Sequence, residues 1–167
     1  MVAEFQFNNL LVRPMHDKDQ EAVIALRSEK EIMVGLGESS GQYSQAEFLW
    51  ELANSDEYVI TSSAHVIGGV MLNEMAASDG EIDLTGREFS YYLSPLYWGQ
   101  GIMTNVLKKL IDWILDDGID HLQAEVFVNN QRSMNLLKRI GFTKDIELFD
   151  PISQKNKAIW SFSALNE

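Results

Sequence analysis

A short segment with two glycines, Trp98-Gly99-Gln100-Gly101, directly precedes a long amphipathic stretch and restricts the fold more than any other feature. Because glycine has no Cβ, this segment can turn tightly and bring its backbone close to a ligand. Leucine and isoleucine recur at helical spacing after it, which predicts a helix over residues 104–117 that stops at Gly118. The start of such a helix presents unpaired N–H groups and the positive end of the helix dipole. The segment therefore predicts a phosphate-binding turn at a helix N-terminus.

A second motif follows further along the chain. Asn130-Gln131-Arg132-Ser133 introduces a helix expected over residues 133–140, and Gly141-Phe142 comes directly after it. A glycine-rich turn alone would be weak support for any ligand, but the turn and the Asn-led helix together favour an acyl-CoA site over a mononucleotide site. The chain also lacks the Lys-Ser/Thr ending of a P-loop and an acidic ribose partner placed for a dinucleotide fold.

The remaining hydrophobic pattern predicts one domain covering residues 1–167, of α/β (α+β) class, with a mixed sheet and helices on both faces. Strands are expected over residues 10–13, 58–61, 66–72, 88–93, 121–128, 142–149 and 158–165. A hairpin turn is expected at Ser62-Ser63, residues 31–43 are expected to be irregular, and residues 81–85 form a polar connection of uncertain form.

Two further helices are expected near the N-terminus. One covers residues 17–28, with Asp17 and Gln20 placed as a capping box, and the other follows a second box formed by Ser44 and Glu47.

Composition excludes several classes of protein. The chain has no cysteine, so disulfides, thiolate metal sites and a cysteine nucleophile are excluded. The net charge of −12 argues against nucleic-acid binding and is compatible with a cationic substrate, although acidic surfaces also serve solubility. The three histidines have no metal-ligand spacing, so we expect no metal site. The chain has no membrane-length apolar run and does not begin like a secretory signal, which favours a cytoplasmic location and no membrane partner.

Residues 88–142 resemble the core of the GNAT superfamily of N-acetyltransferases. Within it, Tyr97-Trp98-Gly99-Gln100-Gly101-Ile102-Met103-Thr104 and the Asn130-x-x-Ser133 to Gly141-Phe142 string look most like the ribosomal-protein N-terminal acetyltransferase group, which also contains enzymes acting on small amines. The resemblance implies a mostly antiparallel sheet of six to seven strands, splayed at the acetyl-CoA site. It also implies acetyl-CoA as co-substrate.

By the same resemblance, the backbone from Trp98 to Thr104 cradles the pyrophosphate, Leu93 pairs with the pantetheine arm, and Asn130 helps to hold that arm. The implied cofactor-binding residues are Leu93, Trp98, Gly99, Gln100, Gly101, Ile102, Met103, Thr104 and Asn130. Two of them depart from the family's pattern: Trp98 stands where Arg or Gln is usual, and Met103 where a small residue is usual. Asn130 can equally be an ordinary helix cap.

Three residues are candidates for catalysis. Many relatives carry a tyrosine acid at the position of Leu137, so the resemblance instead assigns stabilisation of the departing thiolate to Ser133, which can otherwise be a capping residue. The base that deprotonates an ammonium substrate is expected to be Glu88 or Glu125, each of which can also be a solvent-facing strand residue. Tyr91 and Tyr92 adjoin the expected acetyl group and can equally serve sheet packing.

The function expected from the sequence is acetyl transfer from acetyl-CoA to a primary amine, either a peptide N-terminus or a small amine, by direct attack in a ternary complex. Polyamine or amine-drug acetylation is one alternative, and a catalytically impaired acetyl-CoA sensor or interaction module is another. The acceptor is expected to contact residues 29–53 and 149–157, which carry several acids. A homodimer is possible.

Overall fold

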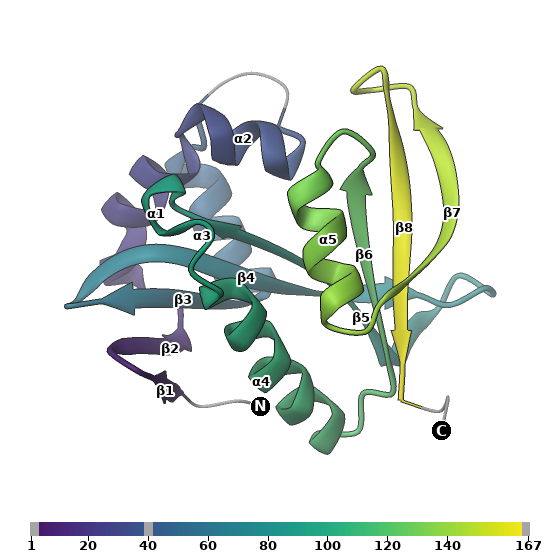
Figure 1. Ribbon diagram of the computed structural model, residues 1–167, viewed down its shortest axis with the longest axis horizontal. Helices are drawn as coiled ribbons and strands as arrows, with labels where there is room; N and C mark the ends of the chain where they lie inside the picture. The colour runs from purple at the N-terminus through teal and green to yellow at the C-terminus, as the bar shows by residue number, and fades with distance from the viewer. Residues whose placement is uncertain (1–3, 39–41, 165–167) are drawn as a thin grey trace.

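The computed structural model describes residues 4–38 and 42–164. Its centre is an eight-stranded sheet in the order β1-β2-β3-β4-β5-β6-β8-β7 (Figure 1). The strands are β1 (Phe5–Phe7), β2 (Leu10–Pro14), β3 (Asp56–Ser62), β4 (His65–Ala76), β5 (Ile82–Leu93), β6 (His121–Phe127), β7 (Thr143–Asp150) and β8 (Lys155–Ser163). Neighbouring strands are antiparallel except for β5 and β6, which are parallel.

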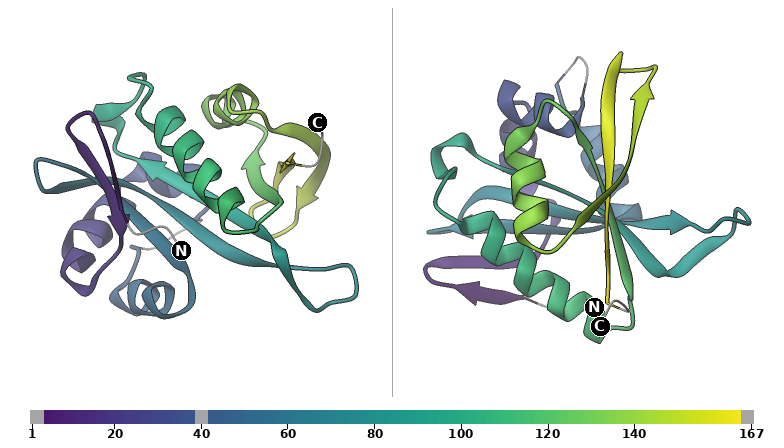
Figure 2. Two further views of the ribbon diagram at one scale, coloured as in Figure 1. Left: turned by 90° about the horizontal axis from the view of Figure 1, so that it is seen from below. Right: turned by 45° about the vertical axis from the view of Figure 1, so that its right-hand side comes forward.

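Helices cover both faces of the sheet. They are α1 (Gln20–Arg27), α2 (Lys30–Leu36), α3 (Gln45–Asn54), α4 (Ile102–Asp116) and α5 (Gln131–Arg139), with short 3-10 turns at Asp17–Asp19 and Pro95–Tyr97. Figure 2 shows α4 and α5 on one face and α1 and α3 on the other. Over the described ranges, no helix is long and apolar enough to cross a membrane.

The apolar stripe of α4 forms the centre of the main core. Val106, Leu107 and Leu110 are at most 1% exposed and pack with the apolar sides of β5 and β6. Each such side chain contributes about 1.5–3 kcal/mol on burial. A smaller cluster joins α1 and α3 to β3 on the other face, around Val23, Phe48 and Val59. The sheet is therefore anchored from both sides.

The sheet divides where β5 and β6 separate. These strands pair only over three positions, from Gly86 opposite His121 to Glu88 opposite Gln123. Beyond Glu88, β5 continues alongside β4 to Leu93, while β6 continues alongside β8 to Phe127. The expected splayed, mostly antiparallel sheet is thus confirmed, and within the described residues the splay leaves two strand edges without a strand partner.

Three expectations about elements are corrected. The sheet has eight strands rather than six to seven, because β1 adds an edge strand that pairs with β2. Residues 31–43 are not irregular throughout, because α2 forms there, buries Ile32 and ends at the left-handed Gly37. Residues 81–85 are not a separate connection, because pairing with β4 begins at Ile82 and extends β5.

The two expected capping boxes have different outcomes. At α3, the Glu47 carboxylate accepts a hydrogen bond from the Ser44 N–H at 2.7 Å and Ser44 Oγ accepts one from the Glu47 N–H at 3.2 Å, so this box is confirmed. The Asp17–Gln20 box is wrong: Asp19 takes the capping role, accepting from the His16 N–H at 2.9 Å, and the first turn is 3-10. Residues 39–41 of the segment expected to be irregular, and Leu165 of the last expected strand, lie outside the described residues.

Candidate active site

A cavity of about 510 Å³ lies at the splay. The end of β5, the turn before α4 and the beginnings of α4 and α5 form most of its lining, and α2 forms a further wall. The site expected from the turn and from the Asn-led helix is therefore one continuous space, although the two motifs are distant in sequence.

The turn before α4 has the backbone geometry that its glycines predict. Gly99 and Gly101 have φ angles of 74° and 73°, in the left-handed region that favours glycine. Gly101 is the N-cap of α4, and its carbonyl accepts the first helical hydrogen bond from Asn105 N–H at 3.1 Å. The Trp98 N–H donates to the Pro95 carbonyl at 3.2 Å, so the N–H groups that can face an anion begin at Gly99.

Trp98 is held by contacts on two sides. Its indole N–H donates to the Leu93 carbonyl at 2.7 Å, and the guanidinium carbon of Arg132 lies 3.5 Å from the centre of its ring. Arg139, at the other end of α5, donates to Thr104 Oγ1 at 3.1 Å. Both arginines line the cavity. Their place at the site was not predicted from the sequence, although their spacing of two helical turns places them on one face of α5.

Most of the residues implied for cofactor binding line this cavity. They are Leu93, Trp98, Gly99, Gly101, Ile102, Met103, Thr104 and Asn130. Gln100 is the exception: it is exposed, and its amide donates to the Leu96 carbonyl at 3.2 Å. Met103 is 7% exposed and belongs to the main core, so its bulk is largely accommodated away from the turn.

Asn130 and Ser133 are both at the cavity, and Asn130 also caps α5. The Asn130 side-chain carbonyl accepts the Ser133 N–H at 3.2 Å. The Ser133 hydroxyl lies 2.5 Å from the Tyr91 hydroxyl, and both residues line the cavity. Burial raises the pKa of Tyr91 to about 12, so its phenol is protonated at neutral pH. Leu137, by contrast, is fully buried in the main core.

The two candidate bases, Glu88 and Glu125, are not among the residues that line the cavity. Because side chains alternate along β5, Glu88 lies on the other face of the strand from Phe89 and Tyr91, away from α4. Glu88 is half-buried, and burial together with the nearby charge of Glu125 raises its pKa. Glu125 forms an ion pair with Lys157 at 2.9 Å. The structure therefore brings the two glutamates near each other, on the other side of the splayed strands.

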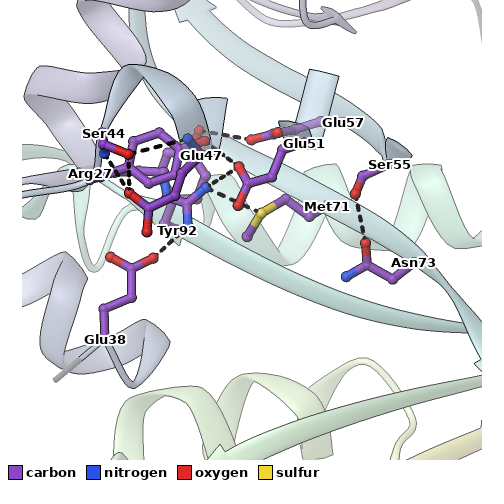
Figure 3. A network of polar contacts seen from close by, with 11 residues as sticks. Arg27, Glu38, Ser44, Glu47, Glu51, Ser55, Glu57, Met71, Asn73 and Tyr92 are labelled. Atoms are coloured by element: carbon purple, nitrogen blue, oxygen red, sulfur yellow. Dashed lines mark hydrogen bonds and ion pairs between the residues drawn. The ribbon is translucent and has the colours of Figure 1, made fainter. Parts of the chain in front are cut away.

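The end of α2 is tied to α1 and α3 by a polar network that the sequence did not reveal. Arg27 forms ion pairs with Glu38, just after α2, and with Glu51 of α3, each at 2.5 Å (Figure 3). Its guanidinium also lies 3.7 Å from the Tyr43 ring. At the end of α2, a Cβ added to Gly37 would lie 2.5 Å from the Phe127 ring of β6. Because Ile32 of α2 packs with Met71 of β4 and Tyr92 of β5, the α2 segment contacts both halves of the splayed sheet.

Comparisons with known proteins agree with this geometry. The family model described as Acetyltransferase (GNAT) domain matches residues 9–143. The thialysine N-epsilon-acetyltransferase of Bos taurus is 40% identical over 50 residues, a match covering 30% of this chain and 29% of that enzyme.

Solved structures share the fold across nearly the whole chain. One is a ribosomal-protein-S5-alanine acetyltransferase from Vibrio fischeri, with a TM-score of 0.77, 20% identity, and coverage of 99% of this chain and 98% of that one. Another is a spermidine N-acetyltransferase from Vibrio cholerae in complex with CoA and spermine, with a TM-score of 0.77, 17% identity and coverage of 94% and 96%.

The chain belongs to the GNAT acetyltransferase family, since the family model matches most of its length. This is a class of enzyme that takes its acetyl group from acetyl-CoA, and the resemblance seen in the motifs of residues 97–104 and 130–142 is confirmed at the level of the family.

Proposed function

We propose that the protein transfers the acetyl group of acetyl-CoA to a primary amine by direct attack within a ternary complex. The observation that carries this proposal is the single cavity at the splay, which joins an anion-binding turn to a pair of hydroxyl groups. A cleft of this size, with a few convergent polar groups, is typical of small-molecule sites.

The residues of the cavity fit the donor. The N–H groups after Gly99 and the guanidinium groups of Arg132 and Arg139 suit phosphate oxygens, which are negatively charged acceptors. The edge of β5 beyond Glu88 has no strand partner on the β6 side and can offer backbone groups to the amides of a pantetheine arm. Asn130, which also lines the cavity, adds a side-chain amide.

Acetyl-CoA supplies a thioester, whose carbonyl is open to attack and whose thiolate leaves. In the proposed reaction, Ser133 donates a hydrogen bond at the position where negative charge develops on the leaving side. Glu88 does not line the cavity, so a water chain carries the proton of the incoming ammonium to it, and burial raises its pKa in the direction that favours proton acceptance. The chain has no cysteine, so we expect no acetyl-enzyme on a thiol.

The acceptor class is proposed from charge. Glu31 on α2 lines the cavity, and Asp150 of the expected acceptor segment lies with Glu125 around Lys157, in a chain with a net charge of −12. These charges favour a cationic amine, and the related fold from Vibrio cholerae was solved with spermine. A peptide N-terminus is the other acceptor that we propose to test.

The test is transfer of a labelled acetyl group from acetyl-CoA to a panel of spermine, spermidine and short peptides with free N-termini. Label is expected in the acceptor, with one free thiol released per acetyl group and none bound covalently to the protein without acceptor. Label that accumulates on the protein would contradict direct attack. Binding of acetyl-CoA without turnover over the whole panel would contradict the enzyme and support the alternative of a CoA sensor.

Salt separates the two acceptor classes. If a polyamine is the acceptor, its KM is expected to rise several-fold between low and physiological ionic strength, because mobile ions screen the acids from the substrate's charges. A KM that does not depend on salt would exclude the polyamine version of the proposal and leave the singly charged peptide N-terminus.

A further inference from the structure

The hydroxyl groups of Tyr91 and Ser133 form a contact that neither the capping role of Ser133 nor the packing role of Tyr91 requires. Tyr91 lies on β5 and Ser133 on α5, and they meet across the cavity with 2.5 Å between their oxygens. Neither helix capping nor sheet packing needs this contact, because the Asn130–Ser133 cap uses the Ser133 N–H and the ring of Tyr91 packs on Phe89 with 5.8 Å between ring centres.

The contact has a preferred direction. The Tyr91 phenol keeps its proton at neutral pH, and the other acceptor near it is the Ser133 carbonyl at 3.5 Å, a poorer distance. If the phenol donates to Ser133 Oγ, the Ser133 proton is left free to point into the cavity. A hydroxyl that accepts one hydrogen bond also donates the next one more strongly.

We propose that Tyr91 is a positioning residue for the leaving-group side of the reaction: its phenol donates to Ser133 and thereby aims the Ser133 hydroxyl at the CoA sulfur. This inference rests on the proposed function and deepens it. The phenol comes from β5 instead of the α5 position of Leu137, whose side chain is buried in the core.

The pair acts as a hydrogen-bond donor and does not give up a proton. A thiol ordinarily titrates near pKa 8.5, so full transfer from a phenol with a pKa of about 12 to a thiolate is uphill by more than three pKa units. Both O–H bonds stay intact in this role, and the thiolate takes its proton from solvent after release. Tyr91 therefore adds no step of its own to the pH profile.

The experiment measures the pKa of the CoA thiol when CoA is bound, from the ultraviolet absorbance of the thiolate as a function of pH. The wild type is expected to lower this pKa below the value for free CoA by about one unit, as one hydrogen bond to a charged group predicts. Ser133→Ala should abolish the part of the shift due to the pair, Ser133→Thr should retain it, and Tyr91→Phe should lose about half of it. Arg132 and Arg139 remain in every variant, so differences report the hydroxyl groups.

Two matched measurements isolate the hydroxyl. Ser90→Ala removes a hydroxyl from the opposite face of the same strand, at a position that does not line the cavity, and should leave the bound thiol at its wild-type pKa. CoA lacking the sulfur should bind wild type and Tyr91→Phe equally, because the lost interaction is with the thiolate. In turnover, Tyr91→Phe should lower kcat about three- to tenfold with little change in KM for acetyl-CoA.

Failure of this inference is distinguishable from failure of the proposed function. A shift that Ser133→Ala removes and Tyr91→Phe leaves intact would overturn the role of Tyr91 while Ser133 remains the donor. A wild type that binds CoA without shifting the thiol pKa would overturn both hydroxyl roles. Absence of CoA binding would contradict the proposed function itself.

Discussion

The guanidinium carbon of Arg132 lies 3.5 Å from the centre of the Trp98 ring, at the edge of the cavity. Trp98 occupies the position where the family resemblance leads one to expect Arg or Gln. The positive charge is thus supplied from α5 and is positioned over the turn by the indole, which is itself fixed through the Leu93 carbonyl. Although Trp98 departs from the family's pattern, the guanidinium of Arg132 supplies a positive charge at the same place.

Arg132→Gln is expected to weaken CoA binding about ten- to a hundredfold, because a charge-assisted hydrogen bond to phosphate contributes about 1.5–3 kcal/mol and part of the cation–π contact is lost as well. Titration calorimetry measures the affinity. The control is Lys138→Gln, which removes a positive charge from an exposed position of the same helix and should leave the affinity unchanged within twofold. Equal losses in the two variants would show a general effect of net charge rather than a contact.

Glu88→Gln is expected to lower kcat/KM about a hundredfold, which is the low end for loss of a general base. Wild-type kcat/KM should fall as pH decreases through the raised pKa of Glu88, because the carboxylate must be unprotonated to accept a proton. The variant should lose this acid limb. If Glu88→Gln kept the wild-type kcat/KM and the same fall of kcat/KM at low pH, Glu88 would be excluded as the base.

Glu125→Gln offers a sharper comparison on the same face. The charge of Glu125 raises the pKa of Glu88, so its removal should lower that pKa and move the acid limb of the pH profile to lower pH. The rate on the plateau should change by less than tenfold, since Glu125 is paired with Lys157. If kcat/KM fell at the same acid pH as in the wild type, Glu88 would not be the group that causes this fall.

The parts of this site that are local in sequence could be predicted, and the parts that depend on distant contacts could not. Gly99, Gly101 and the apolar stripe after them specify the turn and α4 on their own. Tyr91 could be placed on the α4 side of its strand by alternation, but nothing in the strand indicates that Ser133 meets it there. The stacking of Arg132 on Trp98 is likewise a contact between two elements.

The errors in the predicted fold have the same origin. Three residues at Phe5–Phe7 are too few for a strand signal, and their extended form depends on β2 beside them. The glycine- and serine-rich stretch after Glu29 favours a loop locally, but α2 is stabilised by the burial of Ile32 and by the anchoring of Glu38 to Arg27. β5 extends to Ile82 because β4 offers it a partner.

Glu57 is expected to make stability depend on pH. It is 5% exposed, and burial and the charge of Glu51 raise its pKa from 4.5 to about 8, against a smaller opposing effect of Arg27. Below pH 4.5 the Glu57 carboxyl is protonated in both the folded and the unfolded state. As pH rises to about 8, this carboxyl ionises first in the unfolded state, so the free energy of unfolding falls across this window. Glu57→Gln should remove the loss and be more stable than wild type at pH 8, by up to a few kcal/mol.

Urea unfolding of both proteins across this pH range measures the effect, and the difference between them cancels the other titrating groups. A constant difference at all pH values would contradict a raised pKa for Glu57 in the folded state.

Gly37→Ala is expected to destabilise the fold and displace α2. The φ angle of Gly37 is 82°, and the new Cβ would lie 2.5 Å from the Phe127 ring. Gly80→Ala is the matched control, with a φ of 88° and nothing within 4 Å of the Cβ, so it carries the backbone strain of about 1 kcal/mol without the clash. Thermal unfolding should show a larger loss for Gly37→Ala, together with weaker CoA binding. Equal losses of stability in the two variants would mean that the new Cβ does not clash with the Phe127 ring.

Binding of acetyl-CoA in the cavity at the splay is tested most directly by the melting temperature with acetyl-CoA, CoA, ATP and NAD at matched concentrations. A ligand at 100 times its Kd adds about 2.7 kcal/mol to the stability of the folded state. For a chain of this size that corresponds to a rise of roughly 5–10 °C. We expect this rise with the two CoA species alone, and a smaller one for Arg132→Gln. No rise with either CoA species, or an equal rise with ATP or NAD, would contradict the account.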